Sequence, residues 1–244
     1  GTGGGQILYV TSPTTLHRWV IKDNPAFYAE NYISTPRNII DKISFQLYKT
    51  YDGQNFHDVG NNWKKMAEDL MAKEDFGKSL NEDNLWLEKV LEGVVLPTDN
   101  ALQAAKKVYY YVQNNYTCNN HYDKYIKTTL RDVVKKKSGT IGDINLLLIA
   151  LLNYLKIEAH PVLLSTKEYG TNSPTYPLLQ KLNYVVGKIK INSTDYYLDA
   201  SIPFLPFGKL PLNCYNGHAR VISNDTTAVY FEPDLLKESK STSV

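Results

Sequence analysis

Cysteine is scarce in this 244-residue sequence, which contains only Cys118 and Cys214. Two cysteines exclude both a disulfide framework and a four-cysteine structural zinc site. At most one disulfide could form, and the sequence alone leaves open whether the two thiols pair. Long hydrophobic runs are also missing, since the longest covers only residues 146–152 and a bilayer span needs ~20 residues. We therefore expect no membrane span.

An excess of one charge sign is missing as well. The chain has 27 Lys and Arg against 25 Asp and Glu, which leaves a net charge of +2. A nucleic-acid-binding protein would need clustered basic charge for its phosphate contacts, so we expect no nucleic-acid partner. The sequence also has no phosphate-binding loop, no dinucleotide-binding glycine pattern and no nucleophile elbow, which argues against nucleotide chemistry.

The composition is that of a folded protein rich in tyrosine. Hydrophobic residues make up 43% and aromatic residues 12%, which excludes a disordered chain. The 19 Tyr against 7 Phe are typical of surfaces and grooves where an aromatic ring keeps one end in water. The first five residues, Gly-Thr-Gly-Gly-Gly, lack the basic and apolar regions of a signal peptide and suggest a trimmed chain.

The pattern of residues divides the chain into three parts. Residues 1–60 read as short strands, with apolar residues at 19–21, alternation at 43–47 and a hairpin turn at Asp52-Gly53. Because so few strands form only a marginal sheet on their own, we interpret this segment as the C-terminal part of a preceding β domain. Residues 61–236 form the main domain, and we expect the polar tail 237–244 to fray.

The main domain reads as helices followed by an antiparallel sheet. Helical periodicity covers 63–71, 85–94 and 98–115, and the segment 141–155 is apolar on all sides, as in a fully buried helix. Strand patterns follow at 159–165, 182–191 and 195–200. A buried helix that precedes an antiparallel sheet indicates the α+β class.

Four segments resemble a known family. They are residues 139–148 (GTIGDINLLL), 163–166 (LLST), 182–186 (LNYVV) and 197–200 (YLDA). Together they resemble the transglutaminase-like superfamily, with its papain-like core, over roughly residues 98–222. More closely, the chain is similar to a bacterial subfamily in which a β domain of unknown function precedes the transglutaminase-like domain, and residues 25–26, 30 and 43–47 resemble the end of that β domain. The resemblance implies exported Bacteroidetes proteins, periplasmic or on the cell surface, with flanking β domains in the same chain.

The resemblance also implies which positions would carry catalysis. Active members use a Cys in a Gly-x-Cys-x-Asp motif at the helix start, a His in an Asn-His pair and an Asp at the end of the next strand. Here these positions hold Ile141, Tyr184 and Asp199. Isoleucine has no nucleophilic atom, and a phenol with a pKa near ~10 is a poor base at neutral pH. We therefore expect no catalytic residues, no cofactor and no metal.

Three interpretations of the function remain. The first is a catalytically inactive transglutaminase-like domain that serves as a binding or scaffolding module for a peptide, protein or glycan. The second is an active cysteine peptidase or transglutaminase with a rearranged site. The third is a glycan- or peptide-binding cleft that combines Tyr184 with rings from 109–111 or 122–125, with Asp143 and Asp199 nearby.

Other candidate site residues have simpler explanations. Cys118 and His121 could form a replacement dyad, or a metal site with Asp123, but Cys118 follows the C-terminal end of a helix, where the dipole disfavours a thiolate. His160 in a strand and His218 in a turn are expected to be structural.

Overall fold

A computed structural model describes residues 14–28, 30–31, 33–43, 45, 47, 49–58, 62–81, 84–119 and 122–236. The two short tails and a few internal positions lie outside these ranges. Among the helices in these ranges, none is both long and apolar enough to cross a membrane.

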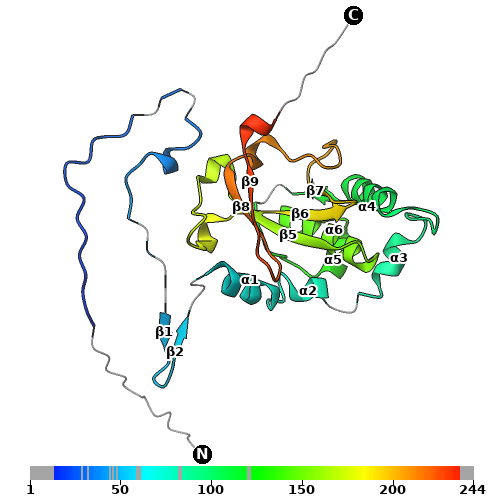
Figure 1. The fold of residues 1–244 in the computed structure, drawn as a ribbon, viewed down its shortest axis with the longest axis horizontal. Coiled ribbons are helices and arrows are strands. Elements are labelled where there is room, and N and C mark those ends of the chain that lie inside the picture. The colour runs from blue at the N-terminus through cyan, green and yellow to red at the C-terminus, as the bar shows by residue number, and fades with distance from the viewer. Residues whose placement is uncertain are drawn as a thin grey trace, which may run out of the picture.

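The centre of the domain is helix α6 (Ile141–Tyr154), and residues 141–152 of it are all buried. It packs on a five-stranded antiparallel sheet with the order β7-β6-β5-β8-β9 (Figure 1). The strands are β5 (Ala159–Leu164), β6 (Tyr184–Ile191), β7 (Thr194–Leu198), β8 (Gly217–Val221) and β9 (Ala228–Phe231). The α+β class is therefore confirmed, together with the fully buried helix.

Other helices cover the remaining sides of α6. They are α1 (Trp63–Met71), α2 (Lys78–Asn81), α3 (Leu87–Leu91), α4 (Ala101–Asn115) and α5 (Leu130–Lys136). Helices α2 to α5 pack against α6, which explains why α6 carries apolar residues all round. Helix α4 begins with a capping box in which Asn100 and Gln103 satisfy each other's free backbone N–H groups.

The sheet has a second apolar layer on the face away from α6. Leu163 and Val185 belong to the core around α6, whereas their neighbours Val162, Leu164 and Val186 pack with Leu210, Cys214 and Phe231. This follows from the alternation of side chains along a strand. Both faces of the central strands are thus buried.

The sequence did not predict every element. Residues 130–136 form α5, and His218 lies in β8, so the turn expected at His218 was wrong. The loop expected after α4 contains β3 (Thr117–Cys118), which pairs in parallel with β4 (Ser138–Gly139). The strands β3, β4 and β8 are short and pair with segments distant in sequence, so the local residue pattern gave little signal for them.

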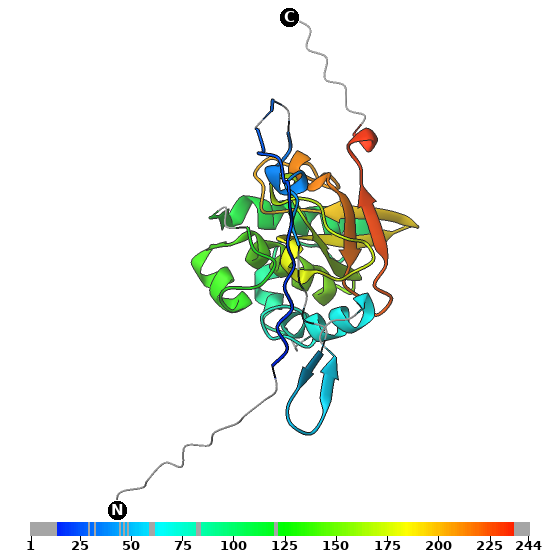
Figure 2. The ribbon, with the colours of Figure 1, turned by 90° about the vertical axis from the view of Figure 1, so that its left-hand side faces the viewer.

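The described parts of the N-terminal arm, between residues 14 and 58, lie outside the packed domain, beside it in Figure 1 and in front of it in Figure 2. Strands β1 (Lys49–Tyr51) and β2 (Phe56–Asp58) form the hairpin predicted at Asp52-Gly53. Residues 19–21 have irregular exposed backbone, so the strand predicted there was wrong; in the part of the arm that is described, no strand pairs with them. Residues 43, 45 and 47 are likewise irregular, and residues 44 and 46 lie outside the described ranges.

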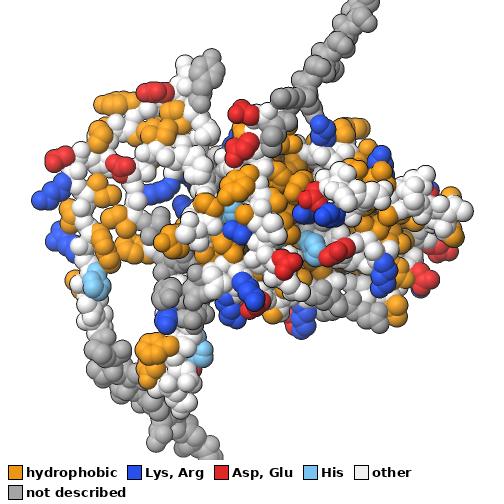
Figure 3. All heavy atoms as spheres, viewed as in Figure 1, with side chains coloured by type: hydrophobic (Ala, Val, Ile, Leu, Met, Phe, Trp, Pro, Cys, Tyr) orange, Lys and Arg blue, Asp and Glu red, His pale blue; other side chains and the backbone are white. Residues whose placement is uncertain are grey.

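Large apolar side chains on the arm face solvent, as Figure 3 shows. The most exposed are Leu16, Tyr28, Phe45, Leu47, Tyr51 and Phe56. The arm touches the domain where the Thr171 N–H donates to Asn38 Oδ1 at 2.8 Å and where Arg37 lies over the Tyr169 ring at 4.8 Å. The proposed boundary between a preceding β domain and the main domain stays a prediction.

Candidate functional site

The start of α6 is fixed by a capping box. Thr140 is the N-cap residue: its Oγ1 accepts from the Asp143 N–H at 3.1 Å, and Asp143 Oδ2 accepts from the Thr140 N–H at 2.8 Å. The other carboxylate oxygen of Asp143 accepts from the Lys127 N–H at 2.8 Å. Asp143 is therefore buried and hydrogen-bonded within the fold.

Ile141 begins α6 and packs with the second apolar cluster, not with the core around the rest of the helix. It is 2% exposed and belongs to the same cluster as Leu164, Tyr184 and Cys214. A side chain at this position is thus surrounded by apolar atoms.

Tyr184 at the start of β6 and Asp199 after β7 meet directly. The Tyr184 hydroxyl donates to Asp199 Oδ2 at 2.7 Å, and the two residues are 1% and 0% exposed. Burial, and then the negative charge of Asp199, raise the pKa of the Tyr184 phenol well above its ordinary value. Tyr184 is therefore a neutral hydrogen-bond donor.

Asp199 receives further donors from its surroundings. Asn145, one turn into α6, donates from Nδ2 to Asp199 Oδ1 at 2.9 Å and to the Val185 carbonyl at 3.0 Å. The Ser201 N–H and hydroxyl both donate to Asp199 Oδ1, at 3.0 and 2.5 Å. These donors compensate a carboxylate that is removed from water. The three positions Ile141, Tyr184 and Asp199 thus lie around a network that joins α6 to the sheet.

A loop covers the start of α6. Gly142 lies so close to this loop that a Cβ there would meet the Tyr125 carbonyl oxygen at 2.6 Å and the Asp123 carbonyl oxygen at 3.0 Å. The Tyr122 ring packs on the Tyr184 ring with a centroid distance of 5.8 Å. Residues 122–127 therefore lie over the helix start from which a nucleophile would act.

The two cysteines lie in different environments. Cys214 is buried, Cys118 is partly exposed, and they do not form a disulfide. Burial, with the charges of Asp199 and Glu168, raises the pKa of the Cys214 thiol well above its usual value. His121 lies outside the described residues, so the dyad of Cys118 and His121 stays untested. Within the described ranges, His, Cys, Asp and Glu side chains form no group of three that could hold a metal ion.

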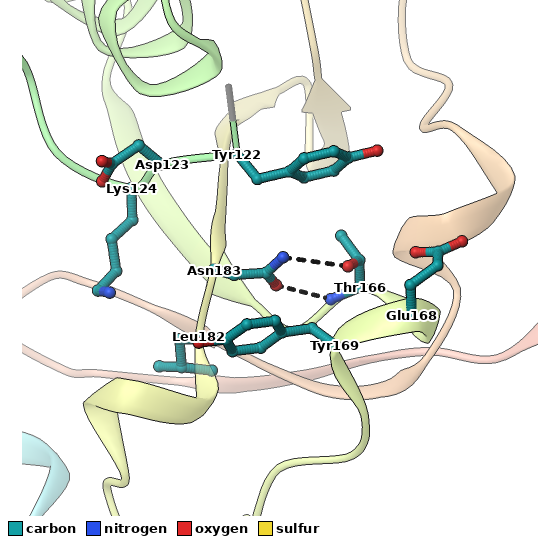
Figure 4. Close-up of a pocket in the computed structure, with 8 residues that line it drawn as sticks. All are labelled: Tyr122, Asp123, Lys124, Thr166, Glu168, Tyr169, Leu182 and Asn183. Atoms are coloured by element: carbon teal, nitrogen blue, oxygen red, sulfur yellow. Dashed lines mark hydrogen bonds between the residues drawn. The ribbon is translucent and has the colours of Figure 1, made fainter. Parts of the chain in front are cut away.

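An open cleft lies beside this buried network. It has a volume of about 390 Å³, and Asn183, next to Tyr184, lies at its centre (Figure 4). Asn183 Oδ1 accepts from the Thr166 N–H at 2.9 Å, and its Nδ2 donates to Thr166 Oγ1 at 3.1 Å. The rings of Tyr122 and Tyr169 lie on opposite sides of this pair. Tyr184 itself is buried beneath Tyr122.

The candidate residues of the 109–111 segment lie away from this cleft. Tyr109 is buried, and its hydroxyl donates to the carbonyl oxygens of Asp199 and Leu205 at 3.0 and 2.8 Å. His160 lies in β5, with its Nε2 2.9 Å from Glu158. His218 contacts the Trp63 and Tyr230 rings, with centroid distances of 5.2 and 5.7 Å.

Residues 88–197 match the sequence model of the transglutaminase-like superfamily. The match includes α6, β5, β6 and the positions of Ile141 and Tyr184. This part of the chain is a transglutaminase-like domain. At these two positions the chain has isoleucine and tyrosine, where the resemblance implies a cysteine nucleophile and a histidine base in active members.

Similar solved structures come from two bacteria. A candidate protease from Parabacteroides distasonis ATCC 8503 is 13% identical, with a TM-score of 0.47, and the match covers 70% of this chain and 30% of that one. A candidate cysteine protease from Cytophaga hutchinsonii is 16% identical, with a TM-score of 0.37, covering 56% of this chain and 42% of that one. This chain thus spans less than half the length of either. Curated proteins gave no significant match.

Sequence reasoning missed Asn145, Ser201 and Tyr169 as parts of the site, whereas the 122–125 segment that it named contains Tyr122, which lines the cleft. Asn145 did carry a signal, because a polar residue in the middle of a helix that is apolar on all sides must find partners inside the fold. Tyr169 carried none, since the 3₁₀ turn that places it has no distinctive pattern.

Proposed function

We propose that this transglutaminase-like domain is catalytically inactive and serves as a binding module in an exported bacterial protein, periplasmic or on the cell surface. The observation that carries the proposal is the arrangement at the helix start. Ile141 is buried in an apolar cluster, and Tyr184 donates a hydrogen bond to Asp199 where an active member would pair a histidine with the aspartate. Export is proposed from the family resemblance alone.

The loop over α6 supports the same proposal. Acyl transfer needs an exposed nucleophile and donors aimed at an oxyanion. Here the 122–127 loop lies against Gly142, and the Tyr122 ring covers Tyr184. Restoring one side chain would therefore leave the helix start covered.

The cleft beside the network is the proposed binding site. Its volume of about 390 Å³ lies within the range of small-molecule sites. Asp123 is paired with Lys127, while Lys124 and Glu168 bring one charge of each sign to the lining. A neutral polar ring suits this lining, since it can stack on Tyr122 and Tyr169 and take hydrogen bonds from the polar groups between them. We therefore propose a glycan as ligand, with a peptide as the competing possibility.

Two experiments test the proposal. Amide hydrolysis and acyl transfer to an amine should both be undetectable in the parent protein and in the Cys118→Ser and Cys214→Ser variants. Turnover in the parent protein that either substitution abolishes would contradict the inactive assignment.

The second experiment measures binding to a panel of neutral oligosaccharides and uncharged peptides. Tyr169→Ala should abolish binding, while the control Tyr176→Ala, at an exposed tyrosine outside the cleft, should not. Binding to peptides alone would overturn the glycan assignment.

A further inference from the structure

A second cavity, of about 780 Å³, shares Lys124 of the 122–127 loop with the tyrosine cleft. It forms where the N-terminal arm faces α1 and the segment 177–181. Its apolar lining consists of Phe45, Leu47, Met66, Leu70, Leu178 and Leu179. The volume lies within the range of about 300–1,000 Å³ that is typical of small-molecule sites.

The charged groups that line the cavity are unbalanced. Three lysines, Lys73, Lys124 and Lys181, face one carboxylate, Asp69. Asp69 already pairs with Lys65, whose Nζ lies 2.8 Å from its Oδ1. Across the described part of the chain, none of the three lysines has a carboxylate oxygen within ion-pair distance.

Two of these lysines share one aromatic ring. The ammonium groups of Lys73 and Lys124 lie 5.2 and 4.9 Å from the centroid of the Tyr125 ring. Burial, and then repulsion from Lys73 and Lys127, lower the pKa of Lys124 in spite of the nearby charge of Asp123. The two ammonium groups therefore lie at one wall with Asp123 nearby but, among the described residues, with no carboxylate in ion-pair contact.

The third lysine extends this positive region. Burial, together with the charges of Lys42 and Arg37 on the N-terminal arm, lowers the pKa of Lys181. The whole chain has a net charge of only +2, so this concentration of positive charge is local. Lys124 and Lys181 are half-buried and Lys73 is exposed, so an anion in the cavity would compensate the partial desolvation of the first two and attract the third.

We propose that this cavity binds a small amphipathic anion. Its apolar body lies against the leucines and Phe45, and its carboxylate or sulfonate head lies beside Lys73 and Lys124. The head of the ligand forms the ion pairs that these lysines lack within the described part of the chain, and the apolar lining favours a ligand with an apolar body over a small hydrated anion.

The test is isothermal titration calorimetry of the whole chain with decanoate, below its micelle concentration, and with decyltrimethylammonium as a cation of equal chain length. Decanoate should bind with one site per chain, and the cation should not bind. Lys124→Gln and Lys73→Gln should each weaken decanoate binding about tenfold, because each removes one charge-assisted contact. Lys64→Gln, at an exposed position on α1 outside the cavity, should leave it unchanged.

Three results would overturn the proposal: no binding of decanoate, equal binding of the anion and the cation, or equal loss in Lys64→Gln and Lys124→Gln. Binding to anionic phosphatidylglycerol vesicles without binding of free decanoate would assign the lysines to a membrane surface and overturn it too. Circular dichroism of each variant checks that it is folded. Tyr169→Ala should leave decanoate binding intact, so failure here is distinguishable from failure of the tyrosine cleft.

Discussion

The substitution Tyr184→Phe tests the hydrogen bond that stands where an active site would have its base. It removes one oxygen, leaves the ring in place and takes away the donor that lies 2.7 Å from Asp199 Oδ2. Both groups are almost fully excluded from solvent, so water cannot replace the donor. A hydrogen bond to a charged partner contributes about 1.5–3 kcal/mol, so we expect the free energy of unfolding to fall by about 2 kcal/mol.

The assay is equilibrium urea unfolding followed by tryptophan fluorescence. The matched control is Tyr122→Phe, whose hydroxyl accepts only a long bond of 3.3 Å from Asn213 Nδ2 and whose side chain is half exposed. The control should stay within about 0.5 kcal/mol of the parent protein. If Tyr184→Phe also stays within that range, the donors from Asn145 and Ser201 satisfy Asp199 alone, and the structural role assigned to Tyr184 is refuted.

Three further predictions concern the surroundings of the site. Gly142→Ala should destabilise the domain by about 1–3 kcal/mol in the same urea assay, because the new methyl group meets backbone atoms of the 122–127 loop. Gly187→Ala should cost less, because its methyl group meets side chains, the nearest at 3.3 Å. Equal costs would contradict this reasoning. Burial and the charge of Arg220 lower the pKa of His218 to about 4. As the pH falls, the unfolded chain therefore binds a proton at this residue before the folded chain does, and the free energy of unfolding should fall by about 2 kcal/mol from pH 7.5 to pH 5. His218→Gln should remove this effect. A chromogenic disulfide reagent should modify Cys214 only after denaturant is added, and rapid modification of Cys214 in the native protein would show that its burial is wrong.

The sequence predicted those parts of the fold that depend on long apolar patterns. The run at 141–155 identified the buried helix α6, and period-two patterns located β5, β6 and β7. It failed at 19–21, where local strand propensity had no partner strand among the described residues, and at β8, whose pairing with β5 joins segments over 50 residues apart.

The candidate site was predictable only in part. The resemblance located Ile141, Tyr184 and Asp199, and the fold brings the last two into direct contact. The cover over the helix start was not predictable, because it depends on the tertiary placement of the 122–127 loop against Gly142. A single glycine after Ile141 does not reveal which backbone approaches it.

The most direct test of the central claim is the pH dependence of thiol labelling in the double variant Ile141→Cys with Tyr184→His. It is made in a Cys118→Ser, Cys214→Ser background, so that the introduced thiol is the only one in the chain. The account predicts slow labelling, a thiol pKa no lower than the ~8.5 of free cysteine, and no amide turnover, because the helix start is covered and its surroundings are apolar. A pKa well below that value together with measurable turnover would contradict the account, since it would mean that the catalytic arrangement is intact apart from two side chains.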